Sequence, residues 1–174
     1  MARYVALLRG INVGGITIAM ADLKDVFSGL GFGNVRTVLA SGNVLFDAGP
    51  ADTAESKARI EAALRARFGY EAFVFVHDQA AVAAIVDAYP FQERDGRHAY
   101  AIFVADPAVL DELAATAAGL DPAVERVARG DGVLYWDVER GQTVRSAFGR
   151  SLGKPRYKAV TTTRNLRTLR KLQV

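Results

Sequence analysis

Residues 9–15, with the sequence RGINVGG, contain three glycines, one arginine and one asparagine. Glycine permits positive φ angles and close approach of another surface, while Arg9 and Asn12 supply hydrogen-bond donors. These are the requirements of a loop that binds an anion such as a phosphate or a carboxylate. The segment is neither the dinucleotide pattern G-x-G-x-x-G nor a phosphate loop ending in Gly-Lys-Ser/Thr, so no standard motif names its ligand. We call residues 9–15 the elbow.

A second polar turn, Ser41-Gly42-Asn43, separates two short β-rich runs within residues 34–47 and is typical of a hairpin. In a β-α-β crossover the loop after the first strand and the hairpin after the second leave the sheet at the same end. We therefore expect the elbow and this turn to be neighbours. Together with the start of the helix that follows the elbow, they predict an anion-receptive pocket. The alternative is architectural: glycines build turns, Asn and Ser bond their own backbone, and Arg9 pairs with an acid.

The charge of the chain is unevenly distributed. The sequence has 22 Lys and Arg and 19 Asp and Glu, and residues 139–174 hold ten of the bases but only one of the acids. This basic segment therefore carries +9, and the 138 residues before it carry −6. Such asymmetry favours an anionic partner, most commonly nucleic acid. The alternative is that the acidic body neutralises the basic segment, within the chain or in a homodimer.

The end of the basic segment, 161-TTTRNLRTLRKL-172, has the pattern of an amphipathic helix. Three leucines fall on one face and the cations on the other, and Thr163 is a suitable N-cap. We expect Arg164 and Asn165, at the start of this helix, to join the anion site. Little aromatic interleaving argues against a base-stacking platform for RNA.

Other chemistry finds no support in the sequence. There are two histidines, His77 and His98, which are not in metal-ligand spacing, and there is no cysteine. The segment 149-GRSLGKP-155 is one residue short of a phosphate loop and has Pro155 in place of the magnesium-binding hydroxyl. We predict no catalytic residue, no metal and no cofactor, and the sequence leaves open whether the protein is an enzyme.

The elements that must position these residues occur in two similar series. Hydrophobic periodicity predicts strands and helices at 3–9, 20–30, 34–47 (a hairpin), 52–68, 72–76 and 78–88, and again at 98–104, 107–118, 123–138 (a hairpin), 143–152, 158–162 and from about 163. Each series reads β-α-β-β-α-β-α. We therefore predict an α+β protein of two tandem ferredoxin-like (βαββαβ) halves, each followed by a helix. The halves are residues 1–89 and 98–174, with a linker at about 90–97.

Composition sets broad limits. The sequence is 51% hydrophobic and 24% charged, as in soluble globular proteins, and has no cysteine. No apolar run reaches the ~20 residues that a membrane helix needs. We expect a cytoplasmic protein with no membrane partner.

The runs 7-LLRGINVGG-15 and 37-TVLASGNVLF-46, followed by 161-TTTRN-165, are similar to a bacterial family known as domain of unknown function 1697. The resemblance spans nearly the whole chain and implies two ferredoxin-like halves but no activity. This chain departs from the family pattern in two places: it has Leu166 where tryptophan is usual, and 141-GQT-143 where Gly-Arg-Ser is usual. The positions that match the pattern are Arg9, Gly10, Asn12, Gly14, Gly15, Ser41, Gly42, Asn43, Arg164 and Asn165.

These ten residues are the predicted ligand-binding site. The function hypothesis is a binding module for an anionic ligand, either nucleic acid or a phosphorylated small molecule. The alternatives are a small enzyme acting on a phosphorylated or carboxylated metabolite, and a structural or regulatory dimer without a ligand.

Overall fold

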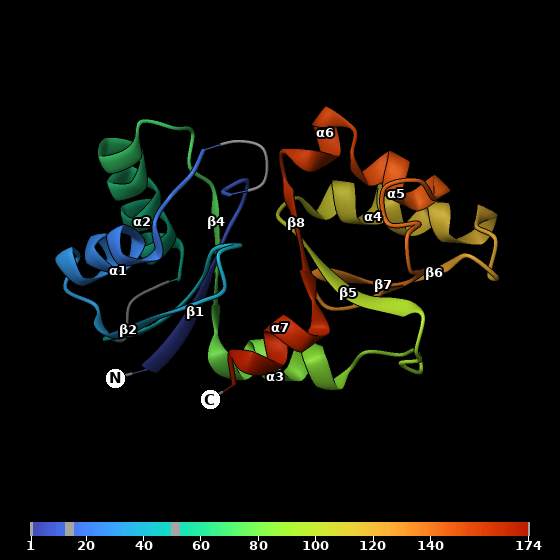
Figure 1. Ribbon diagram of the computed structural model, residues 1–174, viewed down its shortest axis with the longest axis horizontal. Helices are drawn as coiled ribbons and strands as arrows, with labels where there is room; N and C mark the ends of the chain where they lie inside the picture. The colour runs from blue at the N-terminus through green and yellow to red at the C-terminus, as the bar shows by residue number, and fades with distance from the viewer. Residues whose placement is uncertain (1, 13–15, 50–52, 174) are drawn as a thin grey trace. The chain divides into compact units, whose positions relative to one another are not determined.

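A computed structural model describes residues 2–12, 16–49 and 53–173 of the chain (Figure 1). The chain divides into two compact units: residues 1–83 with 170–174 form unit 1, and residues 84–169 form unit 2. The expected linker at 90–97 lies inside unit 2. The protein is α+β, as predicted, because each unit holds a four-stranded antiparallel sheet together with helices.

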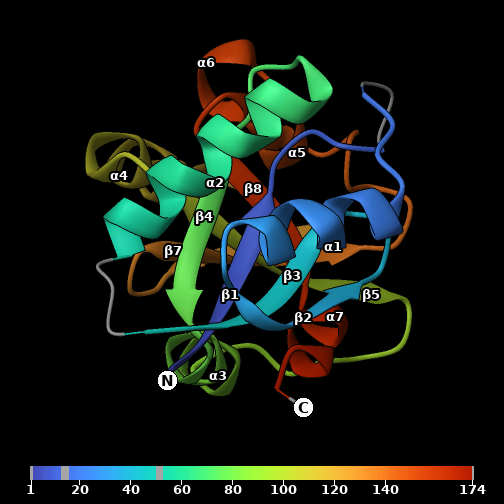
Figure 2. The ribbon, with the colours of Figure 1, turned by 90° about the vertical axis from the view of Figure 1, so that its left-hand side faces the viewer.

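Unit 1 begins with a strand, a helix and a hairpin and continues with a helix and a strand. The bounds are β1 Ala2–Leu8, α1 Met20–Gly29, β2 Gly33–Val38, β3 Asn43–Ala48, α2 Thr53–Phe68 and β4 Val74–Asp78. The sheet order is β2-β3-β1-β4. Helices α1 and α2 cover one face of this sheet (Figure 2). Helix α3, Gln79–Asp87, follows β4 and contains the boundary between the units.

The core of unit 1 follows from the period of two in its strands. Tyr4, Ala6 and Leu8 alternate along β1 and are buried in one cluster with Phe27 of α1 and Ile60 of α2. Burial of such side chains contributes about 1.5–3 kcal/mol each. The last of these β1 residues, Leu8, leads directly into the elbow, so the packing of β1 fixes where the elbow begins.

Unit 2 repeats the strand arrangement, with sheet order β6-β7-β5-β8. Its strands are β5 Arg97–Val104, β6 Glu125–Arg129, β7 Val133–Glu139 and β8 Thr161–Asn165. Its helices are α4 Pro107–Ala115, the short 3₁₀ helix η1 Thr116–Gly119, α5 Ala147–Leu152 and α6 Pro155–Lys158, and α7 Leu166–Lys171 begins within it. The β6–β7 hairpin turns at residues 130–132, as predicted. Its core includes Trp136, packed edge-on at 5.3 Å against Phe148.

A buried carboxylate attaches α5 to the sheet of unit 2. Glu125 of β6 is 2% exposed and accepts hydrogen bonds from the Trp136 indole N–H (3.0 Å) and the Phe148 backbone N–H (3.2 Å). Ser146 caps α5 by accepting from the backbone N–H of Gly149. A Cβ at Gly149 would lie 1.9 Å from the carbonyl oxygen of Thr143, so only glycine fits there. Because Ser146 is its N-cap, the helix expected at 143–152 starts at Ala147.

The end of the chain differs from the predicted series. The last strand is Thr161–Asn165 rather than 158–162, because the short helix α6, with Pro155 in its first turn, precedes it. The final helix begins at Leu166, and Asn165, not Thr163, bonds its first turn through Oδ1, which accepts from the backbone N–H of Arg167 at 2.8 Å. Arg164 therefore lies in a strand, opposite Ala101 of β5. Across the described residues, no helix is both long and apolar enough to span a membrane.

Candidate functional site

The described part of the elbow, residues 9–12, and the β2–β3 turn are neighbours, as predicted. The backbone N–H of Leu8 donates to the carbonyl of Gly42 at 2.8 Å, and the Asn12 side-chain amide donates to the carbonyl of Ala40 at 2.7 Å. The backbone N–H of Arg9 donates to the carbonyl of Phe73, just before β4, at 3.1 Å. The predicted site residues Gly14 and Gly15 lie outside the described residues.

Asn12 holds this junction together. Its φ is +56°, a left-handed conformation that asparagine tolerates. Its Nδ2 group donates to the carbonyls of Ala40 and Ile18 (3.2 Å), and its Oδ1 accepts from the backbone N–H of Ile18 at 2.9 Å. Both N–H donors of the amide thus have partners within the protein.

The turn residues are also bonded internally. Asn43 is fully buried, and its Nδ2 donates to the carbonyl of Val38 (2.8 Å) and to the Ser41 hydroxyl (3.0 Å). Gly42 has φ +89°, and a Cβ there would lie 2.9 Å from both Leu8 Cβ and Ile11 Cδ1. The close approach that glycine permits is therefore to the protein's own core. Gly10 also has a positive φ, +72°, but a Cβ there would meet open space.

Arg164, predicted at the surface, is buried in unit 2. It is 7% exposed, and its guanidinium donates to the Thr162 hydroxyl at 2.5 Å and the Thr163 carbonyl at 3.2 Å. Burial lowers the pKa of Arg164 to about 10, because the charged form loses hydration. The group still carries its charge at neutral pH. Asn165, which follows it, is half-buried and faces a pocket.

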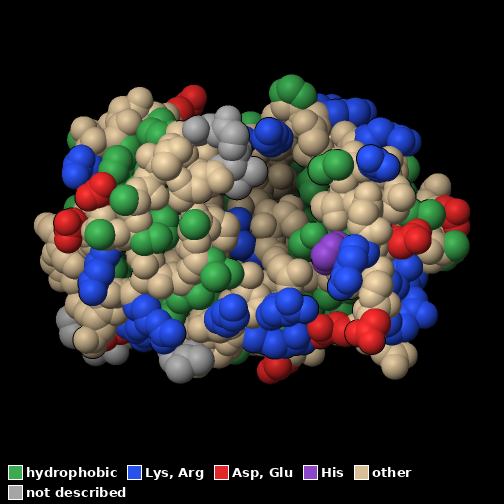
Figure 3. Space-filling model, in the orientation of Figure 1, with side chains coloured by type: hydrophobic (Ala, Val, Ile, Leu, Met, Phe, Trp, Pro, Cys, Tyr) green, Lys and Arg blue, Asp and Glu red, His purple; other side chains and the backbone are tan. Residues whose placement is uncertain are grey.

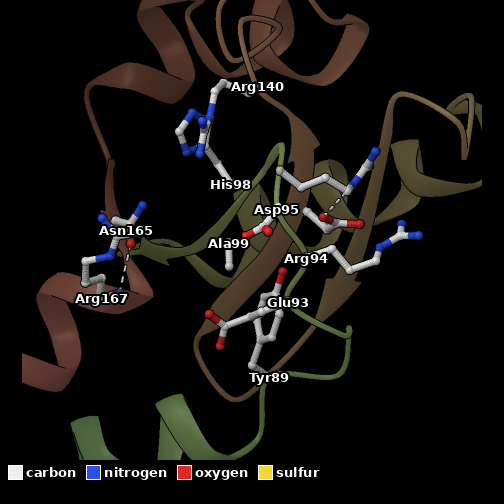
Figure 4. Close-up of a pocket in the computed structure, with 11 residues that line it drawn as sticks. Tyr89, Glu93, Arg94, Asp95, His98, Ala99, Arg140, Asn165 and Arg167 are labelled. Carbon is white, nitrogen blue, oxygen red and sulfur yellow. Dashed lines mark hydrogen bonds and ion pairs between the residues drawn. The ribbon is translucent and has the colours of Figure 1, made fainter.

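This pocket, of about 320 Å³, lies entirely within unit 2 (Figure 4). It is formed by the segment before β5, by β5 itself, by the ends of β7 and β8, and by the start of α7. Its lining residues are Tyr89, Glu93, Arg94, Asp95, Arg97, His98, Ala99, Asp137, Arg140, Asn165 and Arg167. Of the predicted site residues that the structure describes, only Asn165 belongs to it. The sequence predicts a linker at residues 90–97 and has no motif that would place Arg140 and Arg167 in a pocket.

Asp137 is the one deeply buried acid among the described residues of this lining, and two arginines already balance its charge. The Asp137 side chain is 3% exposed and forms ion pairs with Arg97 Nε at 2.8 Å and Arg126 Nη2 at 2.9 Å. The guanidinium of Arg97 also donates to the carbonyls of Ala123 and Val124. A buried carboxylate with two guanidinium partners is compensated, so Asp137 does not make the pocket anionic.

The cationic side of the pocket comes from separate elements. Arg140 follows β7 and lies beside His98, whereas Arg167, in α7, lies beside Asn165 (Figure 4). Within the described part of the chain, neither the Arg140 nor the Arg167 guanidinium has a hydrogen-bond or ion-pair partner. Two guanidinium forks near an amide and an imidazole can hold a phosphate or carboxylate through charge-assisted hydrogen bonds. No group of three or more His, Asp or Glu side chains among the described residues could hold a metal ion.

Other cations of the basic segment are exposed over α5 and α6, on the right in Figure 3. Arg150, Lys154 and Arg156 are among them, and Arg156 forms an ion pair with Glu112 of α4. These side chains do not line the pocket. They form a solvated basic surface of unit 2.

The fold and the pocket define a two-unit α+β protein with a charged small-molecule-sized cavity in its second unit. The chain belongs to the family described as "Protein of unknown function (DUF1697)", whose model matches residues 1–135. The elbow, the β2–β3 turn and the segment before β5 lie inside the matched residues, whereas Arg140, Asn165 and Arg167 lie beyond them.

A solved structure supports the fold. The chain is similar to a conserved bacterial protein, SP0830 from Streptococcus pneumoniae, with 24% identity and a TM-score of 0.80. The match covers 99% of this chain and 97% of the other. At this identity the likeness shows a shared fold. No curated protein matches the chain.

Proposed function

We propose that this protein binds a small phosphorylated or carboxylated ligand in the pocket of unit 2. The observation that carries the proposal is the convergence of Arg140 and Arg167, from two separate elements, on one pocket whose buried acid is already paired. Side chains from separate elements meet at one pocket only through the fold, whereas a solvated basic face needs no such convergence. Asn165, one of the predicted ligand-binding residues, adds a side-chain amide to the same lining, beside Arg167 (Figure 4).

A small ligand suits this site better than nucleic acid. The pocket volume of about 320 Å³ is at the lower end of the ~300–1,000 Å³ that ligand pockets span. Nucleic acid needs a row of exposed cations that follows its backbone. Arg164, expected in such a row, is buried against Thr162 and Thr163 instead.

In this proposal the elbow and the β2–β3 turn have an architectural role. The bonds of Asn12 and Asn43 within the protein support it. Ligand contact by Arg9, Gly10 and the other predicted residues of unit 1 stays a prediction, as do homodimer formation and a cytoplasmic location.

We further propose that each unit is a ferredoxin-like fold. Both units have the element order β-α-β-β-α-β, apart from the extra short helices η1 and α6 in unit 2. Both have the same relative strand order, β2-β3-β1-β4 and β6-β7-β5-β8. This shared order supports a duplication in which unit 2 has the ligand site.

The test is calorimetric titration with inorganic phosphate and with propyl phosphate. We expect Arg140→Ala and Arg167→Ala each to weaken binding about 10- to 100-fold, because each loses a charge-assisted hydrogen bond of roughly 1.5–3 kcal/mol. Arg145→Ala is the matched control, because Arg145 is exposed in the same unit and does not line the pocket.

Three results would contradict the proposal. One is the absence of binding of both inorganic phosphate and propyl phosphate at low salt. Another is an equal loss of affinity in all three variants, which would indicate general attraction to a basic protein. The third is binding of short single-stranded RNA that Arg145→Ala weakens while the pocket variants do not, which would indicate nucleic-acid binding over α5 and α6.

A further inference from the structure

We infer that the ligand of this pocket is a hydroxylated phosphate, such as the phosphate ester of a polyol or sugar, and that the Tyr89 hydroxyl recognises one of its hydroxyl groups. The inference rests on the proposed function, since it names the class of ligand for the same pocket. The evidence for it is the Tyr89 hydroxyl, which is not part of the proposed anion site.

The Tyr89 hydroxyl is buried, lines the pocket and has no hydrogen-bond partner among the described residues. Buried polar groups in folded proteins almost always have a partner, and an unsatisfied one is costly. In Figure 4 the ring of Tyr89 points its oxygen into the middle of the lining. A ligand oxygen at this position would satisfy a donor that the protein leaves without a partner.

The ring of Tyr89 is held in place by its neighbours. It packs edge-on against Phe91 and against Tyr135, each with centroids 5.7 Å apart. Tyr135 is itself fixed, because its hydroxyl donates to the carbonyl of Ile85 at 2.6 Å. Tyr89 is therefore presented to the pocket in a defined position, so it need not lose much rotamer freedom on binding.

The charges near Tyr89 favour a neutral ligand group there. Burial raises the pKa of Tyr89 well above its ordinary value, and the carboxylates of Asp137 and Glu93 raise it more than the guanidiniums of Arg126 and Arg97 lower it. The hydroxyl is thus a proton donor at neutral pH. The carboxylates of Glu93 and Asp95 also line the pocket and would repel a second anionic group.

A ligand hydroxyl meets both requirements. It can accept from Tyr89 and donate to one of the carboxylates of the lining, Glu93 or Asp95. An ammonium group cannot accept, and its burial costs more hydration than that of a hydroxyl. With the phosphate held by Arg140 and Arg167, the pocket is polarised: a cationic side for the anion and a Tyr89 side for hydroxyls.

The experiment compares three phosphate esters with the same three-carbon chain, propyl phosphate, glycerol 3-phosphate and 3-aminopropyl phosphate, titrated into wild type and Tyr89→Phe. We expect glycerol 3-phosphate to bind wild type about 5- to 10-fold more tightly than propyl phosphate, as one added hydrogen bond allows. In Tyr89→Phe this advantage should fall to about 2-fold or less, with propyl phosphate affinity unchanged.

Tyr70→Phe is the matched control. Tyr70 has the other buried tyrosine hydroxyl without a partner among the described residues, and it belongs to unit 1. This variant should leave all three affinities unchanged. Removing an unpartnered hydroxyl does not weaken folding, so the melting of Tyr89→Phe, followed through the single tryptophan Trp136, should not fall below that of wild type.

The outcomes separate the inference from the proposed function. Equal binding of glycerol 3-phosphate and propyl phosphate, or an advantage that persists in Tyr89→Phe, overturns the inference and leaves the anion site. Tightest binding of 3-aminopropyl phosphate also overturns it, in favour of an amine-bearing ligand. If propyl phosphate and inorganic phosphate fail to bind at all, the proposed function itself fails.

Discussion

The elbow junction of unit 1 and the pocket of unit 2 use similar residue types in opposite ways. At the junction, the side-chain amides of Asn12 and Asn43 donate to backbone and hydroxyl oxygens of their own unit at 2.7–3.2 Å. In the pocket, the guanidiniums of Arg140 and Arg167 have no partner among the described residues, and a buried hydroxyl, that of Tyr89, is left unsatisfied.

This difference shows that the partners of a polar group, more than its type, indicate its role. A polar side chain whose hydrogen bonds are complete contributes to the fold, and binding a ligand would require breaking those bonds. A pocket that presents incomplete groups offers them to a ligand without that cost. The elbow has the most distinctive sequence of the chain, yet the side-chain amide of its Asn12 already has its hydrogen-bond partners within the protein.

The largest loss in the free energy of unfolding is expected from a change in the lining of the pocket. Asp137→Ala removes the partner of Arg97 and Arg126, and breaking such a buried pair costs about 3–5 kcal/mol because charge is left uncompensated. Urea unfolding followed through Trp136, in unit 2, should show the loss directly. A change below about 1 kcal/mol would mean that the pair is not part of the folded framework.

Asp47→Ala in unit 1 gives the matching measurement. Asp47 pairs with Arg3 at 2.8 Å across β1 and β3, as Asp137 pairs with Arg97 across β5 and β7, but Asp47 is the more exposed of the two. Hydrogen bonds from Arg3 and Asn34 hold the pKa of Asp47 below its ordinary value. Its stabilising effect is therefore present at neutral pH and is lost as the pH falls through that lowered pKa. We expect a much smaller cost than for Asp137→Ala.

The next effect is expected at the elbow junction, from Gly42→Ala. The new Cβ would lie 2.9 Å from Leu8 Cβ and Ile11 Cδ1 at a φ of +89°, so we expect a cost of about 3 kcal/mol from backbone strain and overpacking. Gly10→Ala is the control: its φ is +72° but the Cβ meets open space, so only about 1 kcal/mol of strain is expected. Chemical denaturation followed by far-UV circular dichroism compares them. Equal costs would show that the elbow does not pack closely on the turn.

The contact between elbow and turn could be predicted from the sequence because it depends on local patterns. The apolar run before the elbow, the amphipathic helix after it and the turn at Ser41-Gly42-Asn43 each specify one element, and crossover handedness then brings the two loops together. The sequence could not show that Asn12 reaches Ala40 and Ile18, because that depends on side-chain geometry within the loop.

The pocket could not be predicted in the same way. Its residues come from three distant segments, 89–99, 137–140 and 165–167, with no periodic spacing between them. The helical spacing of the C-terminal leucines also leads to a wrong prediction for Arg164, which lies in β8 rather than at the start of a helix. The β-branched run Thr161–Thr163 favours a strand, and pairing with β5 extends that strand through Arg164, which buries the cation.

The most direct test of the comparison, with a smaller expected cost than Gly42→Ala, is Asn12→Gly. Glycine keeps the left-handed φ of +56° without strain, so the variant removes the hydrogen bonds to Ile18 and Ala40 and adds the greater backbone freedom of glycine in the unfolded chain. We expect a loss of about 1–2 kcal/mol in the free energy of unfolding and faster amide exchange at Ile18, whose N–H loses its acceptor. Inorganic phosphate affinity should stay within about 2-fold of wild type, because Asn12 is not among the residues that line the pocket. The reverse result, unchanged stability with a 10-fold loss of phosphate affinity, would make the elbow the anion site and the unit 2 pocket a cavity without that role.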